Sequence, residues 1–395
     1  MKQPEIDYWI RAMLAAHDNV SDLNLTVGRT LQVESSGQLK SVTVEPEITE
    51  LTPFQTEVFA LNLINGNRHL MQHLITNGSC DLSYILEGGT RFRVNIFKQQ
   101  NYLSTVLRLL NNEMPTIENM KFPKAFYRMA RDKNGLILFT GATGSGKSTS
   151  MAALLDKINH ERPVHVVTLE DPIEYVHQSD LATFNQRELG NDFNDFFLGL
   201  RAALRQAPKV ILVGEMRDKE TMEIALAAAE TGHLVISTLH TIDTGQAINR
   251  ILGMFEQDEQ SQVRNRLADS IRWVVGQRLL PKIGGGRIAA MEILCTSLRI
   301  KDLIINGETE EKTFYNVIKV GATRDMRTFD QDLVELYKMG EITEEAAMSY
   351  SSNRSEVARG LDMIKSERGE ETSTLAGQLK MEEEEDEDPW MRKRS

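Results

Sequence analysis

Residues 141–149 read GATGSGKST, and their types and spacing fit a loop that binds phosphate groups. The glycines allow backbone shapes that a side chain would block, so successive N–H groups can point at phosphate oxygens. Lys147 would reach the outer phosphates, and the Ser148 hydroxyl would bind Mg²⁺. The expected nucleotide contacts are Gly141, Ala142, Thr143, Gly144, Ser145, Gly146, Lys147, Ser148 and Thr149.

This motif is informative only when it joins a strand to a helix. The apolar run GLILFT at 135–140 predicts a strand before it. Residues 147–159 predict a helix after it, because Met151, Leu154, Leu155 and Ile158 recur at helical spacing. The positive end of that helix dipole would face the phosphates. The alternative, a glycine-rich turn without a ligand, fits the full motif and its two flanks poorly.

Three acidic residues lie at and after the end of the next apolar run, at 164–170. Glu170, Asp171 and Glu174 surround a proline near the carboxyl end of this expected strand. Ligands bind at that edge in open α/β folds. Hydrolysis of ATP needs a group that orients or deprotonates water opposite the γ-phosphate, and a carboxylate can do so. The alternative is an ordinary polar turn after a strand.

Two further expected strands end in polar side chains. VILVGE at 210–215 ends in Glu215, whose carboxylate could hold Mg²⁺ directly or through water. His233 and His240 bracket the run at 234–240 without the spacing of a zinc-binding pair. His240 could sense the γ-phosphate through a hydrogen bond, or be a structural histidine.

Arginines form a third group, in a region without a phosphate loop of its own. Arg91 and Arg93 lie two residues apart, which places both on one face of a strand, and Arg108 lies in another strand-like segment. They could reach the nucleotide of a neighbouring subunit and neutralise charge in the transition state, as arginine fingers do. Salt bridges on an ordinary sheet surface would explain the same spacing.

The chain of 395 residues is long enough for two or three domains. Residues 1–110 predict a small α+β domain, with helices at 6–17 and at 53–76, the latter broken near Gly66. Its expected strands are 22–27, 30–35, 39–45, 80–87 and 91–97. A linker at 111–124 contains Pro115 and Pro123.

Residues 125–355 predict an α/β domain. Apolar strands at 164–170, 210–215 and 234–240 alternate with amphipathic helices up to about 290, which favours a mostly parallel sheet covered by helices. Residues 291–350 predict further helices. After about 355 the chain becomes polar, and 356–395 is expected to be a disordered tail.

Composition narrows the class of protein. The formal net charge of −12 gives no indication of a broad basic face for nucleic acid. Cys80 and Cys295 are too few for a disulfide framework and suit a reducing cytosol. The N-terminus lacks a secretory pattern, and no apolar run approaches the ~18 residues of a membrane span. We therefore expect a cytoplasmic protein.

The end of the chain is strongly acidic. Residues 382–388 are seven consecutive acids, and residues 366–395 hold ten acidic and five basic residues, so they carry −5 of the net charge of −12. Such a block repels itself and stays disordered. It is either a solvated tail or a docking tail for a basic partner.

Together these motifs resemble the secretion ATPases of type IV pilus and type II secretion systems, and most of all the pilus-retraction branch, PilT and PilU. The phosphate loop, the Asp box LEDPIEYVH (169–177), the Walker B segment ILVGEMRD (211–218) and the His box ETGHLVISTLHT (230–241) follow the family's order. VSDLNL at 20–25 is similar to an N-terminal element of the family. The resemblance covers residues 1–365.

The resemblance implies a PAS-like N-terminal domain, a RecA-like C-terminal domain and a homo-hexameric ring that hydrolyses Mg-ATP. It assigns the catalytic glutamate to Glu174 and the Walker B glutamate to Glu215. The His-box histidines fall on His233 and His240. The arginines that reach the nucleotide fall on Arg91, Arg93 and Arg108.

One segment departs from the PilT pattern. Where PilT-type ATPases carry AIRNLIRE, residues 299–306 read RIKDLIIN, so Ile305 and Asn306 replace an Arg–Glu pair. This change and residues 328–350 favour the PilU-like branch, which would depend on a PilT-type partner. An autonomous PilT-type motor and a nucleotide-responsive adaptor ring stay open.

The expected partners follow from the same resemblance. They are further copies of the chain, a platform membrane protein at the inner-membrane base of the pilus and a PilT-type ATPase. A DNA translocase is the remaining alternative, because RecA-like rings also move nucleic acid. The acidic total argues against it, so no nucleic-acid partner is expected.

Overall fold

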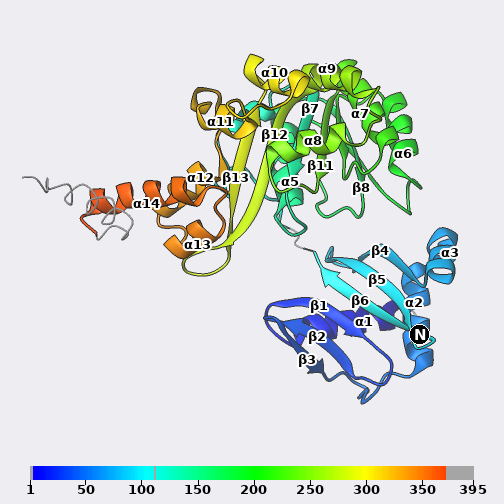
Figure 1. Cartoon of the computed structure of the whole chain (residues 1–395). Coiled ribbons are helices and arrows are strands. Elements are labelled where there is room, and N and C mark those ends of the chain that lie inside the picture. Colours follow the sequence, from blue (N-terminus) through cyan, green and yellow to red (C-terminus); the bar gives the residue numbers. More distant parts are fainter. Residues whose placement is uncertain (1–2, 111–112, 371–395) are drawn as a thin grey trace, which may run out of the picture. The chain divides into compact units, whose positions relative to one another are not determined.

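The computed structural model describes residues 3–110 and 113–370 of the chain. By their contacts, they form two compact units. One unit holds the chain up to Gly135 together with Ser148–Ser237. The other holds Leu136–Lys147 and the chain from Thr238 onward. Each unit therefore combines segments that are distant in sequence, and Figure 1 labels their elements.

The first sheet has six strands in the order β3-β2-β1-β6-β5-β4, and all neighbours are antiparallel. The strands are β1 (Val20–Leu25), β2 (Leu31–Ser35), β3 (Gln38–Val42), β4 (Ser79–Ile85), β5 (Arg91–Gln99) and β6 (Tyr102–Leu109). Three helices belong to the same part of the chain: α1 (Gln3–Ala15), α2 (Pro53–Ile64) and α3 (Arg68–Asn77). This arrangement confirms the expected α+β class.

Local sequence explains these elements. In β5 the buried side chains of Phe92, Val94 and Ile96 alternate with more exposed positions, as a strand with one buried face requires. The predicted helix at 53–76 is divided near Gly66, as expected. Asn65 ends α2 in the left-handed conformation, and Asn67 caps α3 with its side-chain oxygen.

The second sheet has seven strands in the order β13-β12-β7-β11-β10-β8-β9. They are β7 (Gly135–Thr140), β8 (His165–Glu170), β9 (Thr183–Glu188), β10 (Val210–Val213), β11 (Leu234–Leu239), β12 (Ile271–Pro281) and β13 (Arg287–Cys295). The pairs β12–β7, β11–β10, β10–β8 and β8–β9 are parallel, and β12–β13 is antiparallel. The predicted mostly parallel sheet is confirmed, and sequence reasoning missed β9, β12 and β13.

The register aligns the carboxyl ends of the central strands. Val213, the last residue of β10, is level with Leu169 on β8 and Ser237 on β11. The segments that follow these strands therefore leave the sheet at one edge. The helices of this part are α4 (Ala125–Met129), α5 (Lys147–Glu161), α6 (Phe196–Ala203), η1 (Leu204–Gln206), α7 (Lys219–Glu230), α8 (Thr244–Leu252) and α9 (Gln260–Ser270).

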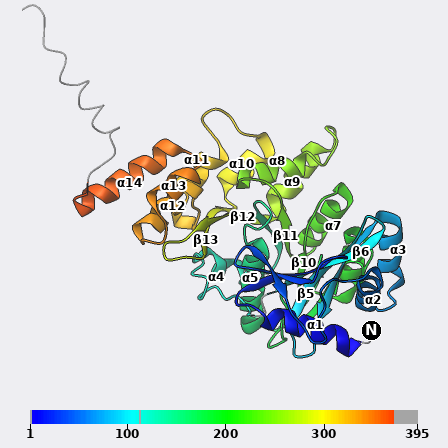
Figure 2. The same ribbon diagram turned by 90° about the horizontal axis from the view of Figure 1, so that it is seen from below.

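The C-terminal part differs from the expectation at both ends. Residues 291–295 belong to β13, not to a helix. The remaining elements are α10 (Leu298–Asn306), α11 (Phe314–Lys319), η2 (Ala322–Arg324), α12 (Phe329–Lys338), α13 (Glu344–Ser349) and α14 (Arg354–Arg368). Figure 2 shows α12, α13 and α14 side by side.

Helix α14 contradicts the prediction that the polar tail begins at 356. Val357, Leu361 and Ile364 recur at helical spacing along one helix face and are buried. Val357 and Leu361 join a core cluster with Phe329 and Leu333 of α12. The acidic run at 382–388 lies outside the described residues.

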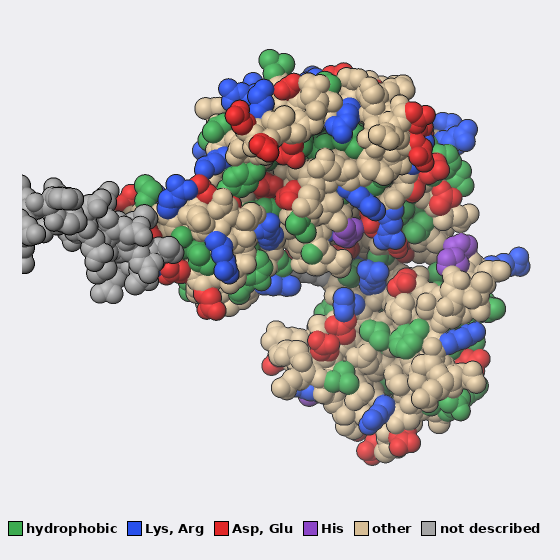
Figure 3. Space-filling view, viewed as in Figure 1, with side chains coloured by type: hydrophobic (Ala, Val, Ile, Leu, Met, Phe, Trp, Pro, Cys, Tyr) green, Lys and Arg blue, Asp and Glu red, His purple; other side chains and the backbone are tan. Residues whose placement is uncertain are grey.

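The surface shown in Figure 3 carries acidic and basic side chains interspersed with each other, over the N-terminal sheet as over the helices around the second sheet. Among the described residues, no helix is both long enough and apolar enough to cross a lipid bilayer.

Candidate active site

The phosphate loop links β7 to α5, as its motif predicts. Gly141 has φ +148°, and a Cβ added there would lie 2.4 Å from the Gln277 carbonyl oxygen and 2.6 Å from Ser145 Oγ. Gly146 has φ +89°, and its added Cβ would lie 3.1 Å from Gln277 Nε2. The buried Gln277 of β12 thus packs so closely against the loop that Gly141 has no room for a side chain, and Gly146 has little.

Two buried polar groups in this loop fit a phosphate ligand. Lys147 is 8% exposed, and its Nζ donates to the carbonyl oxygens of Gly141 (2.8 Å) and Ala142 (3.0 Å). Ser145 Oγ is buried without a hydrogen-bond partner, which is unfavourable unless a ligand supplies one. A cationic group and an unsatisfied hydroxyl within one glycine loop at a helix N-terminus match the chemistry of a bound phosphate.

Alanine at Gly141 should therefore disrupt the loop. Its Cβ would collide with a backbone carbonyl, so the loop must move, and we expect Gly141→Ala to weaken ADP binding at least ~10-fold, through strain of about 1–3 kcal/mol or more. Gly144→Ala is the matched control, because Gly144 has φ +78° but nothing within 4 Å of its added Cβ. Calorimetric titration with ADP measures both variants, and equal affinities would refute this role of the Gln277 contact.

The Asp-box residues lie where strand β8 ends. Glu170 accepts hydrogen bonds from Thr168 Oγ1 (2.6 Å) and Gln186 Nε2 (3.1 Å). The pKa of Glu170 is raised to about 7, mainly by burial and in part by the nearby Glu174, while its two hydrogen bonds and Arg91 act in the opposite direction. Burial therefore favours the protonated form of this carboxyl more than water does.

Glu174 lies on the loop after β8, and that loop is tied to the phosphate-binding helix. The Tyr175 hydroxyl is 3.1 Å from Thr149 Oγ1 in the first turn of α5. On the other side, Gln186 Nε2 donates to the Tyr175 carbonyl oxygen (2.8 Å). These contacts place Tyr175, the residue after Glu174, beside the first turn of α5, which contains Ser148.

The Walker B strand β10 presents Glu215 at the same edge. Gly214 N donates to Leu169 O (2.7 Å), and an added Cβ there would lie 3.1 Å from that oxygen, so β10 and β8 approach closely. Glu215 Oε2 forms an ion pair with Arg217 Nη2 at 2.6 Å. Among the described residues, no group of three or more His, Cys, Asp or Glu side chains could hold a metal by itself.

The two histidines lie at opposite ends of β11. His240 follows the carboxyl end, where Thr241 N donates to the hydroxyl of Thr140, the last residue before the phosphate loop (2.9 Å). His233 precedes the amino end, its Nδ1 lies 3.0 Å from Ala228 O, and its carbonyl accepts from Gly135 N, at the start of β7 (3.0 Å). His240 therefore lies at the carboxyl edge of the sheet, and His233 lies at the opposite edge.

The three arginines share one face of the N-terminal sheet, because Arg93 is the cross-strand partner of Arg108 and Arg91 lies two residues before Arg93. Arg108 Nε pairs with Asp22 Oδ1 at 2.8 Å, and Arg93 Nη2 lies 4.0 Å from Asp81 Oδ1. Within one chain, Arg93 and Arg108 therefore form salt bridges on the sheet surface, which is the alternative to a role at the nucleotide.

Arg91 differs from the other two, because it contacts the Asp-box loop of its own chain. Its Nη2 donates to Ile173 O (2.8 Å) and its Nη1 to Glu174 O (3.2 Å). Burial lowers the pKa of Arg91, and the carboxylates of Glu188 and Glu170 counteract this. Arg91 thus holds the backbone around Glu174, a contact that the sequence did not reveal.

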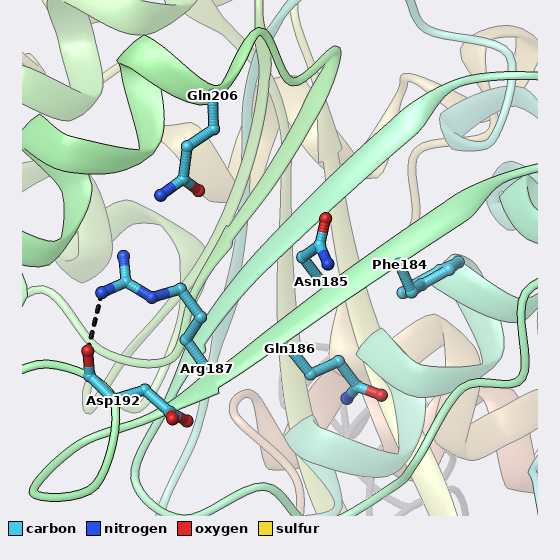
Figure 4. A pocket seen from close by; sticks show the side chains of 6 residues that line it. All are labelled: Phe184, Asn185, Gln186, Arg187, Asp192 and Gln206. Atoms are coloured by element: carbon cyan, nitrogen blue, oxygen red, sulfur yellow. Dashed lines mark hydrogen bonds between the residues drawn. The ribbon is translucent and has the colours of Figure 1, made fainter.

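A hollow of about 590 Å³ lies along β9 (Figure 4). It is lined by Phe184, Asn185, Gln186, Arg187, Asp192 and Gln206. Within it Arg187 Nη2 donates to the Asp192 carbonyl oxygen at 2.8 Å. The hollow contains none of the sequence-predicted site residues, so we do not assign it to catalysis.

Comparison with known proteins identifies relatives of this chain. Residues 74–378 match the family model described as Type II/IV secretion system protein. The chain is 37% identical to the type IV pilus ATPase PilU of Pseudomonas aeruginosa, over 92% of this chain and 93% of PilU. It is 38% identical to PilT, the type IV pilus retraction ATPase of the same organism, over 84% of this chain and 94% of PilT.

A solved structure supports the same relationship. The crystal structure of the pilus retraction motor PilT with bound ADP superposes with a TM-score of 0.79 at 40% identity, and covers 90% of this chain and 99% of that one. The likeness includes both the antiparallel N-terminal sheet and the RecA-like part.

Proposed function

The chain belongs to the Type II/IV secretion system protein family, and from this premise we propose that it is a motor ATPase that couples ATP hydrolysis to type IV pilus retraction and so to twitching motility. The observation that best supports the proposal is a contact between two parts of the site, the loop of Glu174 and helix α5. The Tyr175–Thr149 contact joins the loop of Glu174 to the helix that follows the phosphate loop.

Different residues of the site would bind the phosphates, activate water and stabilise the developing charge. The N–H groups of residues 141–146, Lys147 and Ser145 would hold the phosphates. Glu174 would take a proton from water as the water oxygen bonds to the γ-phosphorus and the bond to the β–γ bridging oxygen breaks. ADP and inorganic phosphate are then the products, and Lys147 would stabilise the negative charge that develops.

Mg²⁺ is part of this proposal. Ser148 would be its protein ligand. Glu215 would bind it directly or through water, once the ion pair between Glu215 and Arg217 has broken. The ion would supply further charge neutralisation at the phosphates. His240 would sense the terminal phosphate from the same edge.

We further propose that six copies form a ring in which Arg93 and Arg108 reach the nucleotide of a neighbouring subunit. Both arginines are substantially exposed, with 46% and 68% of their side chains accessible, so they can serve such an interface. Hydrolysis would change the angle between the N-terminal and RecA-like domains and drive a platform membrane protein at the inner-membrane base of the pilus. The ring would work in the cytoplasm, docked on that machine.

Within the retraction branch we favour the PilU-like role, in which a PilT-type partner couples the ring to the pilus. The altered residues Ile305 and Asn306 of α10 support it, as does the longer span of the PilU match. An autonomous PilT-type motor and a nucleotide-responsive adaptor ring are the alternatives.

Light scattering and an ATPase assay on the purified full chain test the ring and its metal. We expect a particle of six chains with ADP and Mg²⁺, ATP turnover that is lost on chelation, and recovery on adding Mg²⁺. A monomer that hydrolyses ATP at the same rate at all protein concentrations would refute the ring. Turnover that persists in the chelator would refute the metal assignment.

A further inference from the structure

Glu188, at the end of β9, connects three segments of the chain. It is buried, with 5% of its surface exposed. Its Oε2 accepts hydrogen bonds from Ser83 Oγ of β4 (2.6 Å) and from Ile173 N of the Asp-box loop (3.2 Å). Its Oε1 accepts one from Asn191 Nδ2 (2.6 Å). A buried carboxylate needs several such donors, and here one of them comes from the N-terminal sheet.

The Ile173 residue is therefore held on both sides. Its N–H donates to Glu188, which Ser83 orients, and its carbonyl oxygen accepts from Arg91. Ser83 and Arg91 lie on the adjacent strands β4 and β5, where Ser83 faces Arg93 in the register. One hairpin of the N-terminal sheet thus contacts the residue that precedes Glu174 twice, directly through Arg91 and indirectly through Ser83 and Glu188.

Charge supports the arrangement. The Arg91 guanidinium interacts with the carboxylates of Glu188 and Glu170, which lie at the ends of the paired strands β9 and β8. If the hairpin withdraws, Glu188 loses a donor, and both carboxylates lose their nearby cation. Buried ionic groups depend strongly on such partners, so the loop would rearrange rather than keep its position.

We propose that Glu188 is a positioning residue through which the β4–β5 hairpin holds the loop of Glu174 in place for hydrolysis. With Ser83 and Arg91 engaged, the loop is fixed and Glu174 can act on water. With the hairpin withdrawn, the loop is released and hydrolysis stops. This rests on the proposed function, and it makes the position of the N-terminal domain a control on turnover.

The test compares Ser83→Ala with two matched variants. Ser83→Thr keeps a hydroxyl. Ser35→Ala removes a buried hydroxyl of the same sheet that bonds Asp18 O at 2.7 Å and does not reach the loop. We expect Ser83→Ala to lower kcat about tenfold, as loss of a hydrogen bond to a charged group predicts, while the ADP dissociation constant changes less than twofold. Ser83→Thr should restore kcat, and Ser35→Ala should leave it unchanged.

A double-mutant cycle tests Glu188 together with Ser83. Glu188→Gln should lower kcat at unchanged ADP affinity, and combining it with Ser83→Ala should add little, because both changes break the same connection. Additive effects would contradict the connection. Wild-type kcat in Ser83→Ala, or equal losses in Ser83→Ala and Ser35→Ala, would overturn the proposal.

Hydrogen exchange provides a readout that does not require hydrolysis. The amide of Ile173 is protected by Glu188, so exchange across 171–176 should be faster in Ser83→Ala than in wild type or Ser35→Ala. Unchanged exchange would also overturn the proposal. If the wild-type chain showed no turnover but exchange changed as expected, the proposed function would fail while the loop connection stood.

Discussion

Replacing Glu174 by Gln is expected to leave nucleotide binding intact and to reduce ATP turnover by about 10²–10⁴-fold, the usual contribution of a general base. The amide has nearly the same shape as the carboxylate but cannot accept the proton of the attacking water. The two carbonyl oxygens that Arg91 contacts, those of residues 173 and 174, belong to the backbone and are retained. Steady-state ATPase rates and an ADP titration measure the two effects separately.

Two further variants make this result specific. Glu223→Gln changes an exposed glutamate on α7 and should leave the rate unchanged. Glu170→Gln tests the rival carboxyl, whose pKa burial raises to about 7. Normal turnover in Glu174→Gln together with a hundredfold loss in Glu170→Gln would transfer the role of base to Glu170.

The Lys147→Ala variant is expected to lose both nucleotide affinity and turnover, with kcat/KM reduced by at least ~100-fold. Lys147 is the buried cation of the phosphate loop, and removing one preorganised charge-stabilising donor costs about 2.7–4 kcal/mol in the transition state. Its hydrogen bonds to Gly141 and Ala142 would also be lost.

A lysine on the same helix controls for the loss of a charge. Lys157 pairs with Glu118 and Glu161 at 3.3 Å, ten residues after Lys147, and such a surface pair contributes little. Lys157→Ala should therefore bind ADP and hydrolyse ATP as wild type does. Wild-type kcat/KM in Lys147→Ala would remove the basis for a phosphate site in this loop.

The fold was predictable where the hydrophobic pattern is strong. The strands β7, β8, β10 and β11 are apolar runs buried on both faces, and the glycine motif locates the turn between β7 and α5. Strand β9 reads TFNQRE, with neither an apolar run nor clean alternation, so its pairing with β8 came only from the structure. Helix α14 was missed although Val357, Leu361 and Ile364 recur at helical spacing, because charged residues dominate both ends of the helix and the segment was read as a polar tail.

The site was predictable where a residue follows a strand end. Glu170, Glu174, Glu215 and His240 come from segments that leave the sheet at its carboxyl edge, which sequence order and strand periodicity already indicate. The pairing of Ser83 with Glu188 joins residues 105 apart and depends on where two sheets meet. No local pattern encodes such a contact. His233 and His240 precede and follow β11, as their positions around the apolar run predicted.

Pilus retraction in living cells tests the central claim most directly. The cells would hold this protein together with a PilT-type partner whose own phosphate-loop lysine is replaced, so that only this chain can hydrolyse ATP. We predict retraction with the wild-type chain, none with Lys147→Ala, and little or none when the partner is absent. Retraction that is equal with wild type and Lys147→Ala, or absent with both in the presence of the partner, would contradict a motor that powers retraction.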